Sequence, residues 1–360
     1  MGGRGPQAGR RAGKEDKGTN PFRKPDCNPH RASKEGRKLR VLVTGGAGFI
    51  GSHLVDELLA QGHEVVVLDD FSQGNEANIA HNLSNPSFRL VRGDVTDASL
   101  MESLVRDCEL IYHLAAVVGV YYVLQDPLRT IRVNVLGTEL VLALAQRYRR
   151  RVLVASSSEV YGKSRKSRLK ETDNGVFGPP EASRWCYALS KSLDEHMALA
   201  YHRLGLEVSV VRYFNAYGPR LDPRGYGSVI ARFISQALEG KPITVYGDGS
   251  QTRSFTYVAD TVQGTILAAT LPQALGKIFN IGNGREISIL ELAELVKEKA
   301  ASSSPIVFVP YSEAYGPDFE EARKRCPDTS KAERILGFKA EVPLEEGLER
   351  TIRWFKERKG

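Results

Sequence analysis

Short apolar runs rich in β-branched residues alternate with segments of helical periodicity between residues 39 and 211. The runs predict buried strands at residues 41–44, 64–68, 88–92, 110–114 and 152–155. Helices are expected between them, notably at residues 53–61, 131–148 and 183–204. Strands and helices that alternate through short connections predict an α/β protein with a doubly wound parallel sheet.

The alternation loosens beyond Asn215. Residues 215–223 and 247–254 read as loops, and helices are expected at residues 228–239 and 289–300. This part predicts a smaller α/β substrate lobe that closes over the carboxyl edge of the sheet, where ligands bind in such folds. We expect a sheet domain over residues 39–212, to which residues 252–283 return, and a lobe made of residues 213–251 and 284–360.

A glycine-rich turn follows the first strand. Gly45, Gly48 and Gly51 stand between residues 41–44 and the next helix. Free N–H groups at a helix N-terminus bind a diphosphate, and glycines let the backbone approach it. Asp69 ends the second strand about 20 residues later, where a carboxylate accepts both ribose hydroxyls of an adenosine. No Arg follows closely in the segment DDFSQGNEAN, so the pattern favours NAD over NADP.

The composition is that of a large globular chain without a membrane span. The 360 residues are 41% hydrophobic, and no apolar run reaches the ~18 residues of a spanning helix. The four cysteines lie far apart, which predicts free thiols in a reducing compartment, the cytoplasm, and no metal site.

The net charge of +7 comes from one end of the chain. Residues 1–38 hold eleven Lys or Arg and four Asp or Glu, whereas the remainder has 39 of each. The folded body therefore has no basic excess for binding nucleic acid. The N-terminal segment lacks the apolar stretch of a secretory signal, and we expect it to be disordered; a weak polyanion contact is the alternative.

Candidate chemistry begins with Tyr187 and Lys191, which share one face of the predicted helix. Using a Tyr of pKa near 10 as a base near pH 7 costs roughly 4 kcal/mol. A neighbouring ammonium and a cationic nicotinamide ring would offset much of that. Taken alone, the pair is also what an amphipathic surface helix would carry.

A hydroxyl-rich segment supplies the context for that pair. The segment ASSSEVYG, residues 155–162, directly follows a predicted strand. Its serines are suited to hold a substrate oxygen beside Tyr187, and Glu159 adds a carboxylate at the same edge of the sheet. The glycine turn, the serines and the Tyr–Lys pair together predict one active site.

Seven motifs in order resemble the extended short-chain dehydrogenase/reductase family that acts on sugar nucleotides: TGGAGFIGS, HLAA, NVLGT, SSSEVYG, YALSK, FNAYGPR and QTRSFTYVAD. The resemblance runs from about residue 39 to the C-terminus. It implies a Rossmann-like NAD-binding domain with a nucleotide-sugar lobe. It also implies a homodimer formed through helices at residues 131–148 and 183–204.

The resemblance also assigns site residues. The catalytic set it implies is Ser157, Glu159, Tyr187, Lys191 and Arg325. NAD contacts would come from Gly45, Gly48, Phe49, Ile50, Gly51, Asp69, Asp94, Val95, Ala115, Asn134, Tyr187 and Lys191, and substrate contacts from Ser157, Ser158, Asn215 and Arg253. Three alternatives stay open: Asp94 could cap the following helix, Arg253 could pair with Asp260, and Arg325 could form an ion pair at a helix start.

Family members share a first step, in which Tyr187 would take the proton of the 4-hydroxyl and NAD the hydride, giving a 4-keto sugar. Ser158 stands where 4,6-dehydratases usually carry an Asp acid, which disfavours that reaction. Ser158-Glu159 and Arg325-Cys-Pro-Asp are similar to UDP-glucuronate decarboxylases, our first choice. A UDP-glucuronate or UDP-glucose 4-epimerase is the alternative. The segment 117–126 departs from the pattern of enzymes that form UDP-xylose, and we expect it to cover the sugar.

Overall fold

A seven-stranded parallel sheet forms the centre of the protein. The computed structural model describes residues 1–3, 37–225, 227–316, 320 and 322–358. The strands lie in the order β11-β6-β5-β4-β1-β2-β3, and every neighbouring pair is parallel. They span β1 Arg40–Thr44, β2 Glu64–Asp69, β3 Phe88–Arg92, β4 Leu110–His113, β5 Arg151–Ser157, β6 Val208–Tyr213 and β11 Ile278–Ile281. The predicted doubly wound sheet is confirmed.

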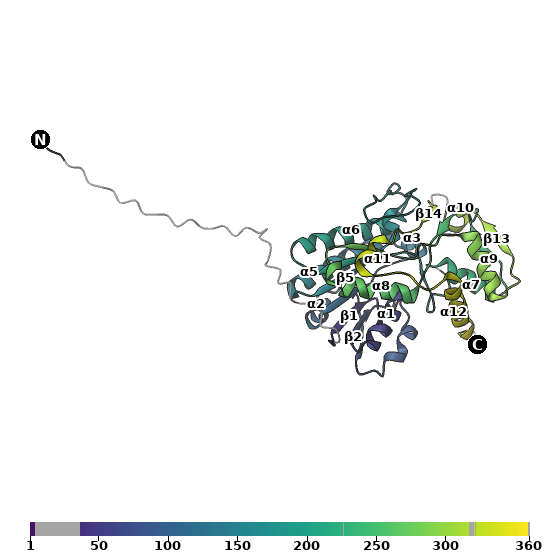
Figure 1. The fold of residues 1–360 in the computed structure, drawn as a ribbon, viewed down its shortest axis with the longest axis horizontal. Helices are drawn as coiled ribbons and strands as arrows, with labels where there is room; N and C mark the ends of the chain where they lie inside the picture. Colours follow the sequence, from purple (N-terminus) through teal and green to yellow (C-terminus); the bar gives the residue numbers. More distant parts are fainter. Residues whose placement is uncertain (4–36, 226, 317–319, 321, 359–360) are drawn as a thin grey trace.

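Helices cover both faces of this sheet (Figure 1). Leu42 and Ile111 point to one face with the helices α2, α5 and α6, whereas Val41 and Val43 point to the other with α1 and α8. Near-continuous apolar strands are what a sheet buried on both faces requires. The bounds are α1 Phe49–Ala60, α2 Ala98–Asp107, α3 Val120–Gln125, α4 Pro127–Ile131, α5 Gly137–Tyr148, α6 Trp185–Arg203, α8 Val258–Thr270 and α11 Ser330–Leu336.

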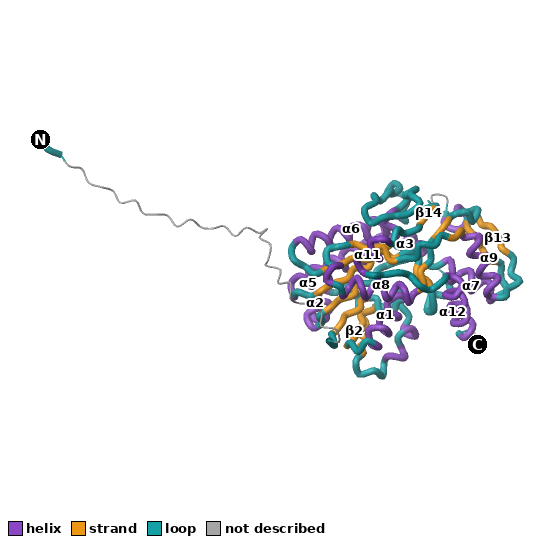
Figure 2. The backbone as a smooth tube through the Cα atoms, in the orientation of Figure 1, coloured by secondary structure: helices purple, strands orange, loops and turns teal. Residues whose placement is uncertain are grey.

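The smaller lobe lies beside the carboxyl edge of the sheet. Figure 2 shows its helices and short strands together, with β13, α7, α9 and α12 on the right. Its strands are β7 Ala216–Tyr217, β8 Ile243–Tyr246, β9 Thr252–Arg253, β10 Thr256–Tyr257, β12 Ile287–Ser288, β13 Ile306–Val309 and β14 Lys324–Arg325. Its helices are α7 Val229–Leu238, α9 Ile289–Ala300, α10 Tyr311–Tyr315 and α12 Leu344–Glu357. Ser288 and Glu291 form a capping box that fixes the start of α9.

Local structure departs from the predicted elements at several places. The segments expected to be loops at residues 215–223 and 247–254 contain the two-residue strands β7 and β9. The helix expected at residues 131–148 is π-helical over Arg132–Leu136 before α5 begins. The segment at residues 117–126, which was expected to cover the sugar, contains the short helix α3. β5 continues to Ser157, so the strand itself carries the first hydroxyls of the site. Most of the N-terminal segment predicted to be disordered lies outside the described residues.

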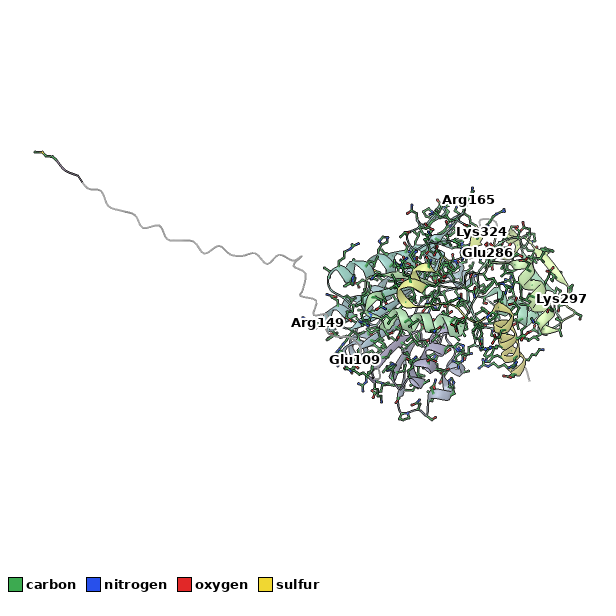
Figure 3. All side chains as sticks on the ribbon, in the orientation of Figure 1. Glu109, Arg149, Arg165, Glu286, Lys297 and Lys324 are labelled. Atoms are coloured by element: carbon green, nitrogen blue, oxygen red, sulfur yellow. The ribbon has the colours of Figure 1, made fainter. Side chains whose placement is uncertain are left out.

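Charged side chains lie at the surface, and the described cysteines are free. Figure 3 shows Glu109, Arg149 and Lys297 at the periphery of the molecule in that view. Cys108, Cys186 and Cys326 are free thiols as predicted, and Cys27 lies outside the described residues. Among the described residues, none of the helices has the length and apolar character needed to cross a bilayer.

A buried ion pair ties the sheet to α6 below the carboxyl edge. Arg212 on β6 donates to both carboxylate oxygens of Glu195, each at 2.7 Å, and the Ser156 hydroxyl donates to the same carboxylate at 2.6 Å. The Arg212 guanidinium also lies 4.7 Å from the centre of the Tyr161 ring. The side chains of Arg212 and Glu195 are 8% and 6% exposed, so loss of either would leave a buried charge without its partner.

We expect Arg212→Ala to lower the free energy of unfolding by about 3 to 5 kcal/mol, because Glu195 would stay buried and unpaired. Urea denaturation at pH 7 measures it. The matched control is Arg106→Ala, whose 3.5 Å pair with Asp107 is exposed and should change stability by less than about 0.5 kcal/mol. Equal effects of the two substitutions would contradict the prediction.

Candidate active site

A cavity of about 720 Å³ opens at the carboxyl edge of the sheet, between the strand ends and the lobe. It spans the point where the strand order reverses, between β1 and β4. The turns that follow these two strands diverge there, which leaves a crevice for a ligand.

The glycine turn forms the floor of the cavity beside β1. A Cβ on Gly45, whose φ is +72°, would lie 2.8 Å from the backbone nitrogen of Ala115. A Cβ on Gly51 would lie 2.2 Å from the carbonyl oxygen of Gly45. Gly48 begins α1 without a side-chain cap, and the first turn of the helix carries no acidic residue. The N–H groups of Gly45, Ala47 and Gly48 already donate hydrogen bonds within the protein, so a diphosphate would be bound by the N–H groups in the first turn of α1.

Asp69 lies at the end of β2 and faces the cavity. Its carboxylate accepts the backbone N–H groups of Ala47 at 2.9 Å and Phe71 at 2.8 Å. Burial raises the pKa of Asp69, and these two hydrogen bonds oppose the rise. A carboxylate has about four acceptor positions, so it can still receive ribose hydroxyls. Its environment fits NAD.

Tyr187 and Ser157 meet on the other side of the cavity. α6 brings Tyr187 to the end of β5, where a hydrogen bond with the Ser157 hydroxyl favours the phenolate. Burial is the larger effect and raises the pKa of Tyr187 above its ordinary value, and the charges of Glu159 and Asp194 raise it further. The phenol therefore stays protonated in this structure.

Lys191 lies one turn further along α6 and forms a buried ion pair. Its Nζ is 3.2 Å from Oδ2 of Asp194, with 4% and 0% of the two side chains exposed. The Lys191 ammonium, which was predicted to stabilise the phenolate of Tyr187, is thus also paired with the Asp194 carboxylate.

Glu159 is held between two arginines. Arg325 pairs with its Oε1, and Nη2 of Arg184 lies 3.2 Å from its Oε2. Burial alone would raise the pKa of Glu159, but the charges of Arg325 and Arg184 outweigh it and lower the pKa to about 2. Glu159 is therefore ionised at neutral pH.

Most of the predicted site residues line this one cavity. They are Gly45, Gly48, Phe49, Ile50, Gly51, Asp69, Asp94, Val95, Ala115, Ser157, Ser158, Glu159, Tyr187, Lys191, Asn215 and Arg325. The segment predicted to cover the sugar contributes residues 117–120, Tyr122 and Val123. Asp97 caps α2, so that alternative for Asp94 does not apply.

Asn134 and Arg253 do not line the cavity. The Asn134 amide is buried in the π-helical segment, where it bonds to the Val117 backbone and the Ser190 hydroxyl. Arg253 donates to the carbonyl oxygens of Thr252 and Arg323 and lies beside Arg325 in the small β9–β14 sheet. Both residues are placed to support the cavity wall, and their predicted ligand contacts stay predictions.

Sequence reasoning assigned no role to Arg184 or Asp194. Asp194 follows Lys191 by three positions and Tyr187 by seven, which is the spacing of one helix face, so this residue could have been found. The contact of Arg184 with Glu159 depends on how the turn before α6 packs, and no sequence pattern indicates it.

Comparisons with known proteins agree with this geometry. The sequence model of GDP-mannose 4,6-dehydratases matches residues 42–351. The chain belongs to this family. It is therefore one of the extended short-chain dehydrogenase/reductases, as the motifs predicted.

Relatives within this family include decarboxylases and epimerases. The chain is 42% identical to a UDP-N-acetyl-α-D-glucosaminuronate decarboxylase of Bacillus cytotoxicus, over 89% of this chain and 98% of that protein. It is 44% identical to UDP-glucuronic acid decarboxylase 1 of Arabidopsis thaliana, over 89% and 71%. The crystal structure of UDP-glucuronic acid 4-epimerase from Bacillus cereus, in complex with UDP-glucuronic acid and NAD, has a TM-score of 0.79 at 30% identity and covers 89% of this chain and 99% of that one.

The ion pairs that Glu159 forms with Arg325 and Arg184 should make the free energy of unfolding depend on pH. Because its pKa falls from 4.5 to about 2 on folding, it stabilises the protein above pH 4.5, and this contribution is lost as the pH falls through 4.5 towards 2. The contribution at pH 7 is on the order of 3 kcal/mol. Urea unfolding of the protein and of Glu159→Gln should differ by a constant amount above pH 5, and the difference should shrink by roughly 1 kcal/mol by pH 3.5. A difference that stays constant to pH 3.5 would argue against the two-arginine pairing.

Proposed function

We propose that this protein is an NAD-dependent UDP-glucuronate decarboxylase that acts through a transient 4-keto sugar. The observation that carries the proposal is the pairing of Glu159 with Arg325 and Arg184 in the cavity that holds Tyr187. Two buried guanidinium groups suit a sugar carboxylate, because guanidinium binds carboxylate through paired hydrogen bonds. The decarboxylases among its relatives support the same reaction.

The cofactor would lie across the crevice between β1 and β4. The glycine turn and the N-terminus of α1 would hold its diphosphate, and Asp69 would hold its adenosine ribose. Bound NAD would supply a hydride acceptor for C4 of the sugar. The carboxylates of Asp69 and Asp70 disfavour the 2′-phosphate of NADP.

Tyr187 and Ser157 would carry the proton transfer. The phenolate of Tyr187 would take the 4-hydroxyl proton while the Ser157 hydroxyl holds that oxygen in place. Lys191 would stabilise the phenolate by its charge. The product of this step is a ketone at C4.

Arg325 and Glu159 would determine which reaction the 4-keto sugar undergoes next. A C6 carboxylate beside a 4-ketone is a β-keto acid, so the bond between C5 and C6 would break with release of CO2 and its electron pair would form an enolate. Uptake of a proton at C5 and return of the hydride to C4 would then give the UDP-pentose. Arg325 would position the carboxylate. Ser158 is 3% exposed and offers a hydroxyl where a dehydratase needs an acid to expel the C6 hydroxyl, so dehydration is disfavoured.

The second candidate is UDP-glucuronate 4-epimerisation. The similarity to the Bacillus cereus epimerase favours it. An epimerase returns the hydride to the opposite face of C4 and keeps the carboxylate. The two reactions share every step up to the 4-ketone, so product analysis distinguishes them.

We expect purified protein given NAD and UDP-glucuronate to release CO2 and form a UDP-pentose, as followed by NMR. Tyr187→Phe should lower kcat by about 100- to 10,000-fold, because the proton acceptor is lost. Glu159→Gln should also stop CO2 release. The control is Tyr246→Phe, a tyrosine on β8 of the lobe outside the lining of the cavity, which should leave kcat unchanged. A galacto-configured uronate product would favour the epimerase, and full activity of Tyr187→Phe would exclude both candidates.

We also propose that the protein forms a homodimer through α6 and the helical segment at residues 131–148. Leu189 and Leu193 on α6 are 48% and 46% exposed, and Ile131 and Leu136 on the other segment are 42% and 57% exposed. An apolar surface on two adjacent helices is typical of an interface between subunits.

The double substitution of Leu189→Glu and Leu193→Glu should convert the dimer to a monomer, because the charges would be buried at the interface. Light scattering after size exclusion measures the mass. Phe308→Glu is the matched control, since Phe308 is a 55% exposed apolar residue on β13 in the lobe. A parent protein that is monomeric at micromolar concentration would refute the proposed dimer.

A further inference from the structure

Two loops that flank the glycine turn are joined to each other by one side chain. Because β1 lies between β4 and β2 in the sheet, the loops that follow β4 and β2 lie on opposite sides of the glycine turn. In the loop after β2, Nε2 of Gln73 donates to the carbonyl oxygen of Val118 at 3.0 Å. The N–H of Val118, in the loop after β4, donates to Oε1 of Gln73 at 3.1 Å. These two hydrogen bonds form a strap between the loops.

Each end of the strap is attached to the wall of the cavity. On one side, the Asn75 N–H and the Asn78 side-chain amide donate to the carbonyl oxygen of Ala47 in the glycine turn, at 3.1 and 3.0 Å. On the other side, the Asn134 amide accepts the Val117 N–H at 2.8 Å and donates to the Val117 carbonyl oxygen at 3.3 Å. Both loops are therefore held in place, and the strap spans only the gap between them.

The strap crosses the part of the cavity that would hold the cofactor diphosphate. Gln73 and Val118 line the cavity together with Gly48 of the glycine turn. A diphosphate bound at the N-terminus of α1 would therefore lie between that turn and the strap. While both hydrogen bonds are made, the crevice is closed on this side, and a dinucleotide cannot pass between the two loops.

The strap can open without disturbing the core. Both of its hydrogen bonds are exposed, and such bonds open locally at a small cost in free energy. Gly119, directly after Val118, has a φ of +90° and can change its backbone angles with little steric hindrance. The ion pair of Arg129 with Asp70, which also joins the two sides, is exposed and contributes little. Opening therefore depends mainly on the two hydrogen bonds of Gln73.

We propose that Gln73 is a positioning residue that keeps a gate over the cofactor crevice closed, and that this gate opens whenever a dinucleotide enters or leaves. A gate that is closed both before and after binding slows entry and exit by the same factor, so it leaves the affinity unchanged. A residue that only contacted the cofactor would slow exit alone and would raise the affinity. The inference rests on the use of NAD in the proposed function and does not depend on which sugar is the substrate.

The test compares the full chain with Gln73→Met, which keeps the length of the side chain but cannot form the two hydrogen bonds. Stopped-flow fluorescence of NADH gives the association rate, and displacement by excess NAD gives the dissociation rate. We expect Gln73→Met to raise both rate constants about tenfold and to change Kd by less than about threefold. The matched control is Gln61→Met, which removes an exposed amide that contacts Glu57 on α1 and should change neither rate.

Two results would overturn the gate: unchanged rates, or a faster dissociation with an equal loss of affinity, which would make Gln73 a direct cofactor ligand. Hydrogen exchange without cofactor gives a second measurement, in which the Val118 N–H should exchange faster in Gln73→Met than in the parent; equal exchange would also overturn the proposal. Should Gln73→Met not fold, Gln73→Asn, whose side chain is one methylene shorter, replaces it with the same expected results. Absence of CO2 release from UDP-glucuronate would refute the proposed function and leave these measurements unaffected.

Discussion

The reversal of strand order between β1 and β4 is the constraint on which the site depends. Crossovers that leave these two adjacent strands run to opposite faces of the sheet, so the turns after them separate and open a crevice. The glycine turn can occupy that crevice only because its backbone packs against itself: a Cβ on Gly51 would meet the Gly45 carbonyl at 2.2 Å. The lobe then covers the crevice, and α6 supplies Tyr187 from the side. The residues predicted to bind the nucleotide and those predicted to react with the sugar therefore lie at one edge of the sheet.

Charge balance is the second organising feature. Below and around the cavity, Glu195 pairs with Arg212, Asp194 with Lys191, and Glu159 with Arg325 and Arg184. Each group is largely removed from water, and a buried charge without a partner is strongly destabilising. The arginine and acidic side chains around the cavity can therefore stay charged only in ion-paired groups whose net charge is close to zero. Binding of such a ligand must rearrange or add to these sets.

The parts of this arrangement that sequence predicts are those encoded by local spacing. The strand, glycine turn and helix at residues 40–60, and the Tyr187–Lys191 pair, follow from side-chain periodicity alone. The two-residue strands β9 and β14 are too short to leave a periodic pattern, and they decide where Arg253 and Arg325 lie. The π-helical turn buries Asn134 against the Val117 backbone behind the cavity wall, and no propensity at residues 132–136 indicates it. Pairing of Arg184 with Glu159 depends on tertiary packing between segments 25 residues apart.

The pairing of Glu159 also bears on substrate selection in the proposed reaction. A sugar with a neutral C6 hydroxymethyl group would leave the Glu159–Arg325 pair intact and gain little from the guanidinium. A sugar carboxylate would instead share Arg325 and Arg184 with Glu159, and this second carboxylate would balance the charge of the two guanidinium groups. Once the sugar carboxylate departs as CO2, Glu159 would again be the only anion between the arginines. The loss of charge from the substrate thus removes its strongest electrostatic contact, which favours release of the product.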